Sequence, residues 1–149
     1  IPHTGSQIRF ACEQLRDWQD MEAPVQLWIM LGTNDLLQER QFTAEDTAQR
    51  MEDFLKKIMA EPAVSDGKIT LRLIAPARME YGAWVDEERL YLESRRLGEE
   101  YRKVAERMGT DFTDAGKWEI PVVYDGVHFS EKGHHIFAQK IQEELTWLR

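Results

Sequence analysis

Apolar residues follow two kinds of pattern along the chain. Three compact apolar runs, at residues 25–31, 68–76 and 110–115, are of strand length, and the first is nearly all apolar. Continuous runs of this kind are typical of parallel strands that are covered on both faces. Apolar residues at helical spacing predict four helices, at residues 7–18, 43–59, 86–108 and 130–148.

The alternating order of these helices and strands predicts a layered α/β fold with a parallel sheet. No repeat, low-complexity tract or linker interrupts the pattern, so residues 1–149 are expected to form a single domain. Residue types at the predicted helix ends agree with this arrangement. Ser6 is a favourable N-cap residue, Thr43 opens a sequence like a capping box, and Gly109 can end a helix.

The composition narrows the classes of partner. The 149 residues carry a net charge of −8, which disfavours a nucleic-acid partner or an anionic membrane surface. No apolar run approaches the roughly 20 residues of a membrane span. The single cysteine, Cys12, excludes an internal disulfide framework and a cysteine cluster for zinc. A single cysteine fits a reducing compartment and favours a cytoplasmic location. Because the sequence starts at Ile1 and not at methionine, secretion after removal of a leader peptide stays an alternative.

Polar residues stand where two predicted strands end, and in parallel α/β sheets this edge holds the active site. The sequence GTND, residues 32–35, directly follows the first apolar run. Gly32 permits a tight turn, and Asn34 offers an amide N–H that can face a developing oxyanion. Asp35 is placed either to cap the next segment or to orient the loop. Taken alone, these residues are also common in ordinary turns.

A second polar group, DGVH at residues 125–128, comes about ten residues after the third apolar run. Neutral imidazole is a good general base near neutral pH. A carboxylate that accepts a hydrogen bond from the second ring nitrogen of the imidazole fixes the tautomer. A separation of three residues on a turn can bring the side chain of Asp125 to that of His128. The alternative is a solvated surface pair, and the spacing alone does not decide between them.

Together, the two groups make the chain resemble the SGNH hydrolase family, also called GDSL esterases and lipases. Residues 32–35 match the family's Gly-x-Asn-Asp block, and residues 125–128 match its Asp-x-x-His block. The resemblance implies a flavodoxin-like, three-layer α/β/α fold and hydrolysis of small-molecule carboxylic esters. The family also includes thioesterases and enzymes that remove O-acetyl groups from sugars. It also implies that Asn34 is an oxyanion-hole donor, that His128 is the base, and that Asp125 orients His128. No cofactor is implied.

The family's first block, Gly-Asp-Ser, is missing. The serines are Ser6, Ser65, Ser94 and Ser130, and none follows Gly-Asp after an apolar run. We therefore expect the nucleophile and the first two strands to lie outside these 149 residues, in an N-terminal segment that completes the sheet. The alternative is a non-catalytic binding or interaction module that keeps the fold without the serine.

Two further sets of residues are candidates for a site. His134 and His135 suggest a metal site, but neighbouring residues on a helix point about 100° apart, so no metal is expected. Tyr81 and Trp84 follow the second predicted strand. Their aromatic rings are expected either to line the substrate pocket at the edge of the sheet or to cover the rim of the core.

Overall fold

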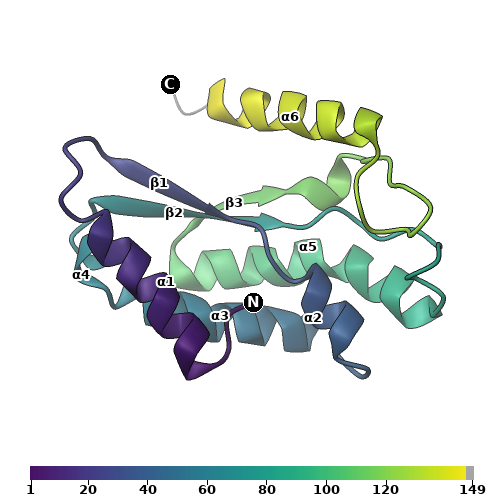
Figure 1. Ribbon diagram of the computed structural model, residues 1–149, viewed down its shortest axis with the longest axis horizontal. Coiled ribbons are helices and arrows are strands. Elements are labelled where there is room, and N and C mark those ends of the chain that lie inside the picture. The colour runs from purple at the N-terminus through teal and green to yellow at the C-terminus, as the bar shows by residue number, and fades with distance from the viewer. Residues whose placement is uncertain (147–149) are drawn as a thin grey trace.

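The centre of the computed structural model, which describes residues 1–146, is a sheet of three parallel strands in the order β1-β2-β3 (Figure 1). The α/β fold predicted from the apolar pattern is therefore confirmed. Residues 147–149, which include the predicted end of the last helix, lie outside the described residues. The elements are α1 (Gly5–Asp17), β1 (Val25–Ile29), α2 (Thr33–Gln38), α3 (Ala44–Met59), α4 (Pro62–Ser65), β2 (Ile69–Ala75), α5 (Glu88–Met108), β3 (Asp111–Asp114), the 3-10 turn η1 (Ala115–Lys117) and α6 (Glu131–Thr146).

Helices cover both faces of the sheet. Helices α1, α3 and α5 lie against one face, and α6 lies over the other (Figure 1). The main core forms under the first face, where Leu73 of β2, Met51 of α3 and Val104 of α5 are fully buried. On the other face, the guanidinium of Arg72 lies 3.8 Å from the carboxylate of Glu144 in α6. This layering leaves the carboxyl ends of the strands free to carry a site.

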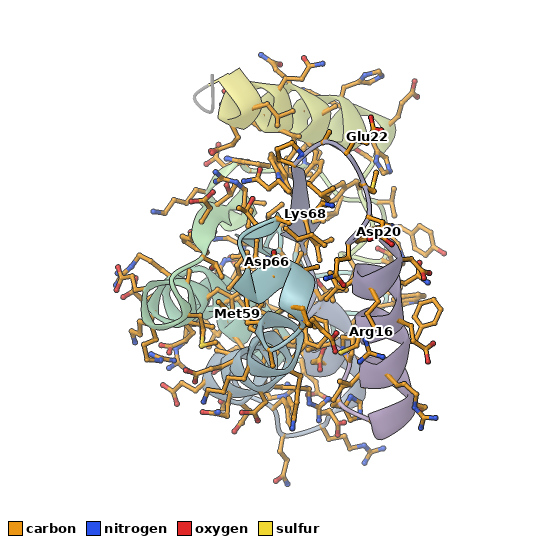
Figure 2. All side chains as sticks on the ribbon, turned by 90° about the vertical axis from the view of Figure 1, so that its left-hand side faces the viewer. Arg16, Asp20, Glu22, Met59, Asp66 and Lys68 are labelled. Atoms are coloured by element: carbon orange, nitrogen blue, oxygen red, sulfur yellow. The ribbon has the colours of Figure 1, made fainter. Side chains whose placement is uncertain are left out.

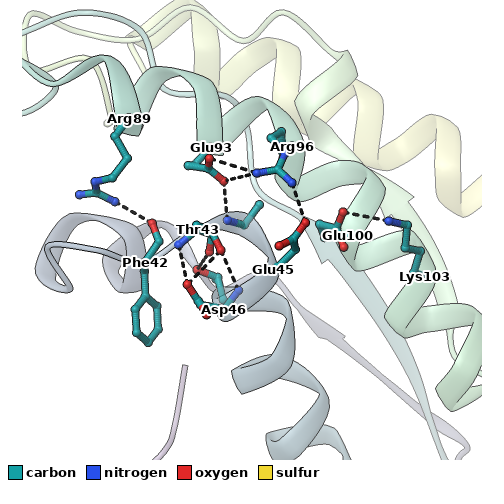
Figure 3. Close-up of polar contacts among 11 residues, drawn as sticks. Phe42, Thr43, Glu45, Asp46, Arg89, Glu93, Arg96, Glu100 and Lys103 are labelled. Carbon is teal, nitrogen blue, oxygen red and sulfur yellow. Dashed lines mark hydrogen bonds and ion pairs between the residues drawn. The ribbon is translucent and has the colours of Figure 1, made fainter.

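Polar contacts fix the start of α3 against α5 (Figure 3). Thr43 and Asp46 form the capping box predicted at this point. The carboxylate of Glu93 in α5 accepts a hydrogen bond from the backbone N–H of Ala44 at 2.7 Å, and Arg96 of α5 bonds both to Glu93 and to a carboxylate of α3. These contacts satisfy backbone N–H groups at the helix start and fix the position of α3 relative to α5 beneath the sheet.

The opposite end of the sheet, where the strands begin, is closed by other polar contacts. Figure 2 looks onto this end and labels Asp66 and Lys68 at the turn before β2. The Nζ of Lys68 donates to the backbone carbonyl of Gln19, which joins this turn to the segment that precedes β1. Arg16 of α1 makes two hydrogen bonds to Glu61, at 2.8 and 2.9 Å. None of the predicted site residues lies here.

Two details differ from the sequence predictions. The N-cap of α1 is Thr4, not Ser6, because the side chain of Thr4 accepts the backbone N–H of Gln7 and completes a capping box. Helix α2 was not predicted, because its six residues are too few for a helical pattern and its start, GTND, also suits a turn. As a result, Asn34 lies on the first turn of a helix.

Strand β1 forms one edge of the sheet, and its only described neighbour is β2. Most of its residues are partly exposed, whereas six of the seven residues of β2 are buried. The expected strands on the other side of β1 stay a prediction.

Candidate functional site

The connections that follow β1, β2 and β3 enclose a pocket of about 260 Å³ at the carboxyl end of the sheet. Gly32 and Asn34 from the first connection and His128 from the third line this pocket. The folded chain thus brings together residues that lie more than ninety positions apart in the sequence. Apart from these residues the lining is mostly apolar, and its larger apolar side chains include those of Met30, Leu31, Met79 and Phe129.

Tyr101 of α5 holds the turn that carries Asn34. Tyr101 is fully buried, and its hydroxyl donates a hydrogen bond to the carbonyl of Leu31 at 2.7 Å. Gly32 has a φ of 131°, and a Cβ at this position would collide with that hydroxyl, so only glycine fits. Burial, with a smaller contribution from Asp35, raises the pKa of Tyr101 well above its usual value, so the phenol keeps its proton.

Replacing Tyr101 with phenylalanine is expected to lower the free energy of unfolding by about 0.5–1.5 kcal/mol, because the carbonyl of Leu31 loses its donor. Urea unfolding with an unchanged m-value would measure the loss. Tyr124→Phe is the matched control, since Tyr124 is 83% exposed and should tolerate the change. Equal stability of the two variants would contradict this role for Tyr101.

Asp35 connects the same turn to α3. Its buried carboxylate accepts a hydrogen bond from Nη1 of Arg50 at 2.8 Å. Gly32, not Asp35, occupies the N-cap position of α2, and no side chain caps this helix. Of the two placements expected for Asp35, the structure therefore shows the one that orients the loop.

Asp125 and His128 meet on the turn that follows β3. Oδ2 of Asp125 lies 2.6 Å from Nδ1 of His128, and Oδ1 accepts the backbone N–H groups of Val127 and His128 at 2.8 and 2.9 Å. Gly126 makes this tight turn possible with a φ of 83°. The Asp125 side chain is 7% exposed and the imidazole is 62% exposed. The carboxylate is held in place, while the ring reaches the surface of the pocket.

The hydrogen bonds also set the charge of Asp125. Burial alone would raise its pKa, but the backbone N–H groups of Val127 and His128, together with the imidazole, outweigh burial and hold the pKa below its usual value. An ionised carboxylate can only accept, so the proton on the ring of His128 lies on Nδ1. No described residue forms a hydrogen bond with Nε2, which leaves this atom available as a base.

A lowered carboxylate pKa makes stability depend on pH in one direction. Asp125 should stabilise the fold fully above its unfolded pKa, about 3.9, and this contribution should be lost as the pH falls through the lower folded value. The difference in free energy of unfolding between the wild type and Asp125→Asn should therefore shrink as the pH falls from about 5 toward 3. Urea titrations between about pH 5 and pH 3 test this prediction, and a difference that grows over this range would contradict it.

The two aromatic candidates lie next to the site but do not line the pocket. The indole of Trp84 packs edgewise against the ring of His128, with ring centroids 5.1 Å apart and an interplanar angle of 78°. Tyr81 instead stacks on Tyr91 of α5, with centroids 4.5 Å apart. Neither residue is among those that line the pocket. A direct contact of Tyr81 or Trp84 with substrate stays a prediction.

The four serines are engaged elsewhere. Ser94 is buried between backbone groups of α5 and Met79, and Ser130 accepts the backbone N–H of Gly133 near the start of α6. Ser6 shares a hydrogen bond with Thr4, and Ser65 donates to the carbonyl of Pro62. None of these hydroxyls forms a hydrogen bond with His128 in the described part of the chain. No serine of the chain is therefore placed as the nucleophile.

The trailing histidines take different positions. His134 packs edgewise on Phe129, and His135 is exposed on α6. Within residues 1–146, no group of three or more histidine, cysteine or acidic side chains is arranged to hold a metal ion. No helix in the same residues is long and apolar enough to cross a membrane.

Comparison with known proteins begins with sequence families. The model of the GDSL-like lipase and acylhydrolase family matches residues 5–136, which include both polar groups at the edge of the sheet. Among curated protein sequences, none matches the chain significantly.

Solved structures share the fold. An aryl esterase from M. smegmatis superposes with a TM-score of 0.76 at 20% identity, covering 96% of this chain and 68% of that one. A carbohydrate acetylesterase from Sinorhizobium meliloti gives 0.73 at 19% identity, covering 93% and 68%. A lipolytic protein of the G-D-S-L family from Veillonella parvula gives 0.63 at 17% identity, covering 93% and 74%. The chain thus spans about two thirds of the length of the first two structures.

Proposed function

The chain belongs to the GDSL-like lipase and acylhydrolase family, a family of SGNH-type ester hydrolases, and on this basis we propose that it supplies the base and the oxyanion donor for serine-dependent hydrolysis of carboxylic esters. His128 is the base, Asp125 orients it, and Asn34 faces the oxyanion. The nucleophilic serine lies outside these 149 residues, in an N-terminal segment whose strands pair with the open edge of β1.

One observation carries this proposal. The buried carboxylate of Asp125 holds Nδ1 of His128 at 2.6 Å and leaves Nε2 without a described partner. The same pocket contains the side chain of Asn34, which makes no hydrogen bond to any described residue. A free base and a free amide donor on one pocket are the two groups that acyl transfer to serine requires besides the nucleophile.

In the proposed reaction, Nε2 of His128 takes the proton of the serine as its oxygen attacks the acyl carbon. The imidazolium that forms is stabilised by Asp125, and the amide of Asn34 donates to the carbonyl oxygen as it becomes negative. His128 then gives its proton to the leaving alcohol oxygen, which produces an acyl-enzyme. Water, deprotonated by the same nitrogen, releases the acid and restores the serine. This chemistry needs no cofactor.

The proposed substrate is a small-molecule ester with an uncharged acyl group. The pocket beside His128 has no Asp, Glu, Lys or Arg among the residues that line it, and its larger side chains are apolar. Such a lining does not compensate a buried charge, so a charged acyl group would be disfavoured. The similarity to a carbohydrate acetylesterase supports acetyl esters as the first substrates to test.

A fluorophosphonate probe tests the proposal, because it reacts only with a serine that a neighbouring base has activated. The intact protein should be labelled, and His128→Ala should abolish labelling. His135→Ala is the matched control, since His135 is exposed on α6 and outside the pocket. Labelling that persists in His128→Ala would reject His128 as the base, and an intact protein that is never labelled would favour a non-catalytic module.

A further inference from the structure

The loop at residues 80–84 is bonded directly to the turn that carries Asp125. Its backbone N–H groups donate to three successive carbonyls of that turn: Trp84 to Asp125 at 3.0 Å, Ala83 to Tyr124 at 3.0 Å, and Glu80 to Gly126 at 2.9 Å. The loop follows β2 and the turn follows β3, so neither local sequence predicts the contact. Together they form one backbone unit at the edge of the pocket.

Two glycines allow this close approach. A Cβ on Gly82 would lie 2.5 Å from the backbone nitrogen of Gly126, and a Cβ on Gly126 would collide with the carbonyl of Glu80. Backbone atoms cannot yield as a flexible side chain can, so any larger residue would separate the two segments. This close backbone contact leaves the turn little freedom to move independently of the loop.

The loop is in turn anchored to α5. The guanidinium of Arg95 bonds to the carboxylate of Glu80 at 2.7 Å and to the carbonyl of Met79 at 2.6 Å. Tyr81 stacks on Tyr91, and Val85 is buried at the other end of the loop. These contacts make the loop a fixed support rather than a mobile flap.

Trp84 is the side chain of this loop that reaches His128. The indole is 52% exposed, and the imidazole that it touches is 62% exposed. A ring that exposed and held by one carboxylate can still rotate about its χ angles, and an edgewise aromatic contact restricts such rotation.

We infer that Trp84 is a positioning residue for His128, and that the loop at residues 80–84 transmits the rigidity of α5 to the Asp125–His128 pair. This inference rests on the proposed function. Trp84 holds the imidazole so that Nε2 faces the pocket, while Asp125 fixes which nitrogen carries the proton.

The test compares Trp84→Leu with Trp84→Phe, and with Phe10→Leu on α1 as the control for loss of an exposed aromatic ring. Trp84→Leu should lower kcat by about tenfold with little change in KM, less than the roughly 10²-fold cost of a 1 Å misplacement. Trp84→Phe should recover most of the activity, because it keeps an aromatic ring. Phe10→Leu should keep wild-type kcat, since Phe10 is 64% exposed on α1 and is not among the residues that line the pocket.

NMR of the labelled histidine rings supplies a readout that does not depend on turnover. In Trp84→Leu, the His128 signals should move and broaden, while those of His134 and His135 stay unchanged. Unchanged His128 signals and unchanged kcat, in a protein that His128→Ala inactivates, would overturn the positioning role alone. If His128→Ala stays active, the proposed function fails, and the His128 signals in Trp84→Leu still decide whether Trp84 orders the ring.

Discussion

Replacing His128 with alanine is expected to lower kcat for hydrolysis of a chromogenic acetyl ester by roughly 10⁴- to 10⁶-fold. Without the imidazole, no group accepts the proton of the nucleophile or returns a proton to the leaving alcohol. The bond between Nδ1 and Asp125 is the contact of this ring that prepares it for both steps. Steady-state kinetics of the intact protein measure the loss.

The fold should tolerate this change, because the imidazole is largely exposed and Asp125 keeps its two backbone donors, Val127 and His128. Urea unfolding of His128→Ala checks this point. His135→Ala, an exposed histidine on α6, should keep wild-type kcat. A fall of less than tenfold in His128→Ala, with folding intact, would exclude His128 as the general base.

The second large effect is expected for Asn34→Ala, which should lower kcat by roughly 10²- to 10³-fold with little change in KM. A donor to the oxyanion acts when charge develops on the carbonyl oxygen, so its removal weakens the transition state more than the bound substrate. Asn34 lies on the first turn of α2, and its amide has no described hydrogen bond to compete with this role.

The turn itself should stay in place without the amide. Tyr101 holds the carbonyl of Leu31, and Arg50 holds Asp35, so neither contact depends on Asn34. Gln38→Ala is the matched control, because Gln38 is exposed on the same helix and outside the pocket. A rise in KM at constant kcat would show that Asn34 stabilises the bound substrate and the transition state equally, and is not an oxyanion donor.

Local patterns predicted most of the fold. Continuous apolar runs marked β1 and β2, and helical spacing marked the four long helices to within two residues at the ends that the structure describes. The Asp125–His128 pair could be predicted because both residues belong to one short turn, where a separation of three residues already brings the side chains together.

The supports of the site could not be predicted, because they depend on contacts between distant segments. Tyr101 fits the apolar pattern of α5, and nothing in that pattern shows that its hydroxyl reaches Leu31, seventy positions away. Arg50 resembles any polar residue of a solvated helix face until α2 places Asp35 beside it. The contact of Gly82 with Gly126 likewise exists only after β2 and β3 pair and bring their following loops together.

The central claim is that Asp125 acts through His128 as one unit that activates a serine. The most direct test is the kcat of Asp125→Asn, His128→Ala and the double variant, measured on one acetyl ester. The claim predicts that Asp125→Asn loses roughly 10⁴-fold, and that the double variant is no slower than His128→Ala alone, because without the imidazole Asp125 has nothing to orient. Losses that multiply in the double variant would show two independent contributions and contradict the claim.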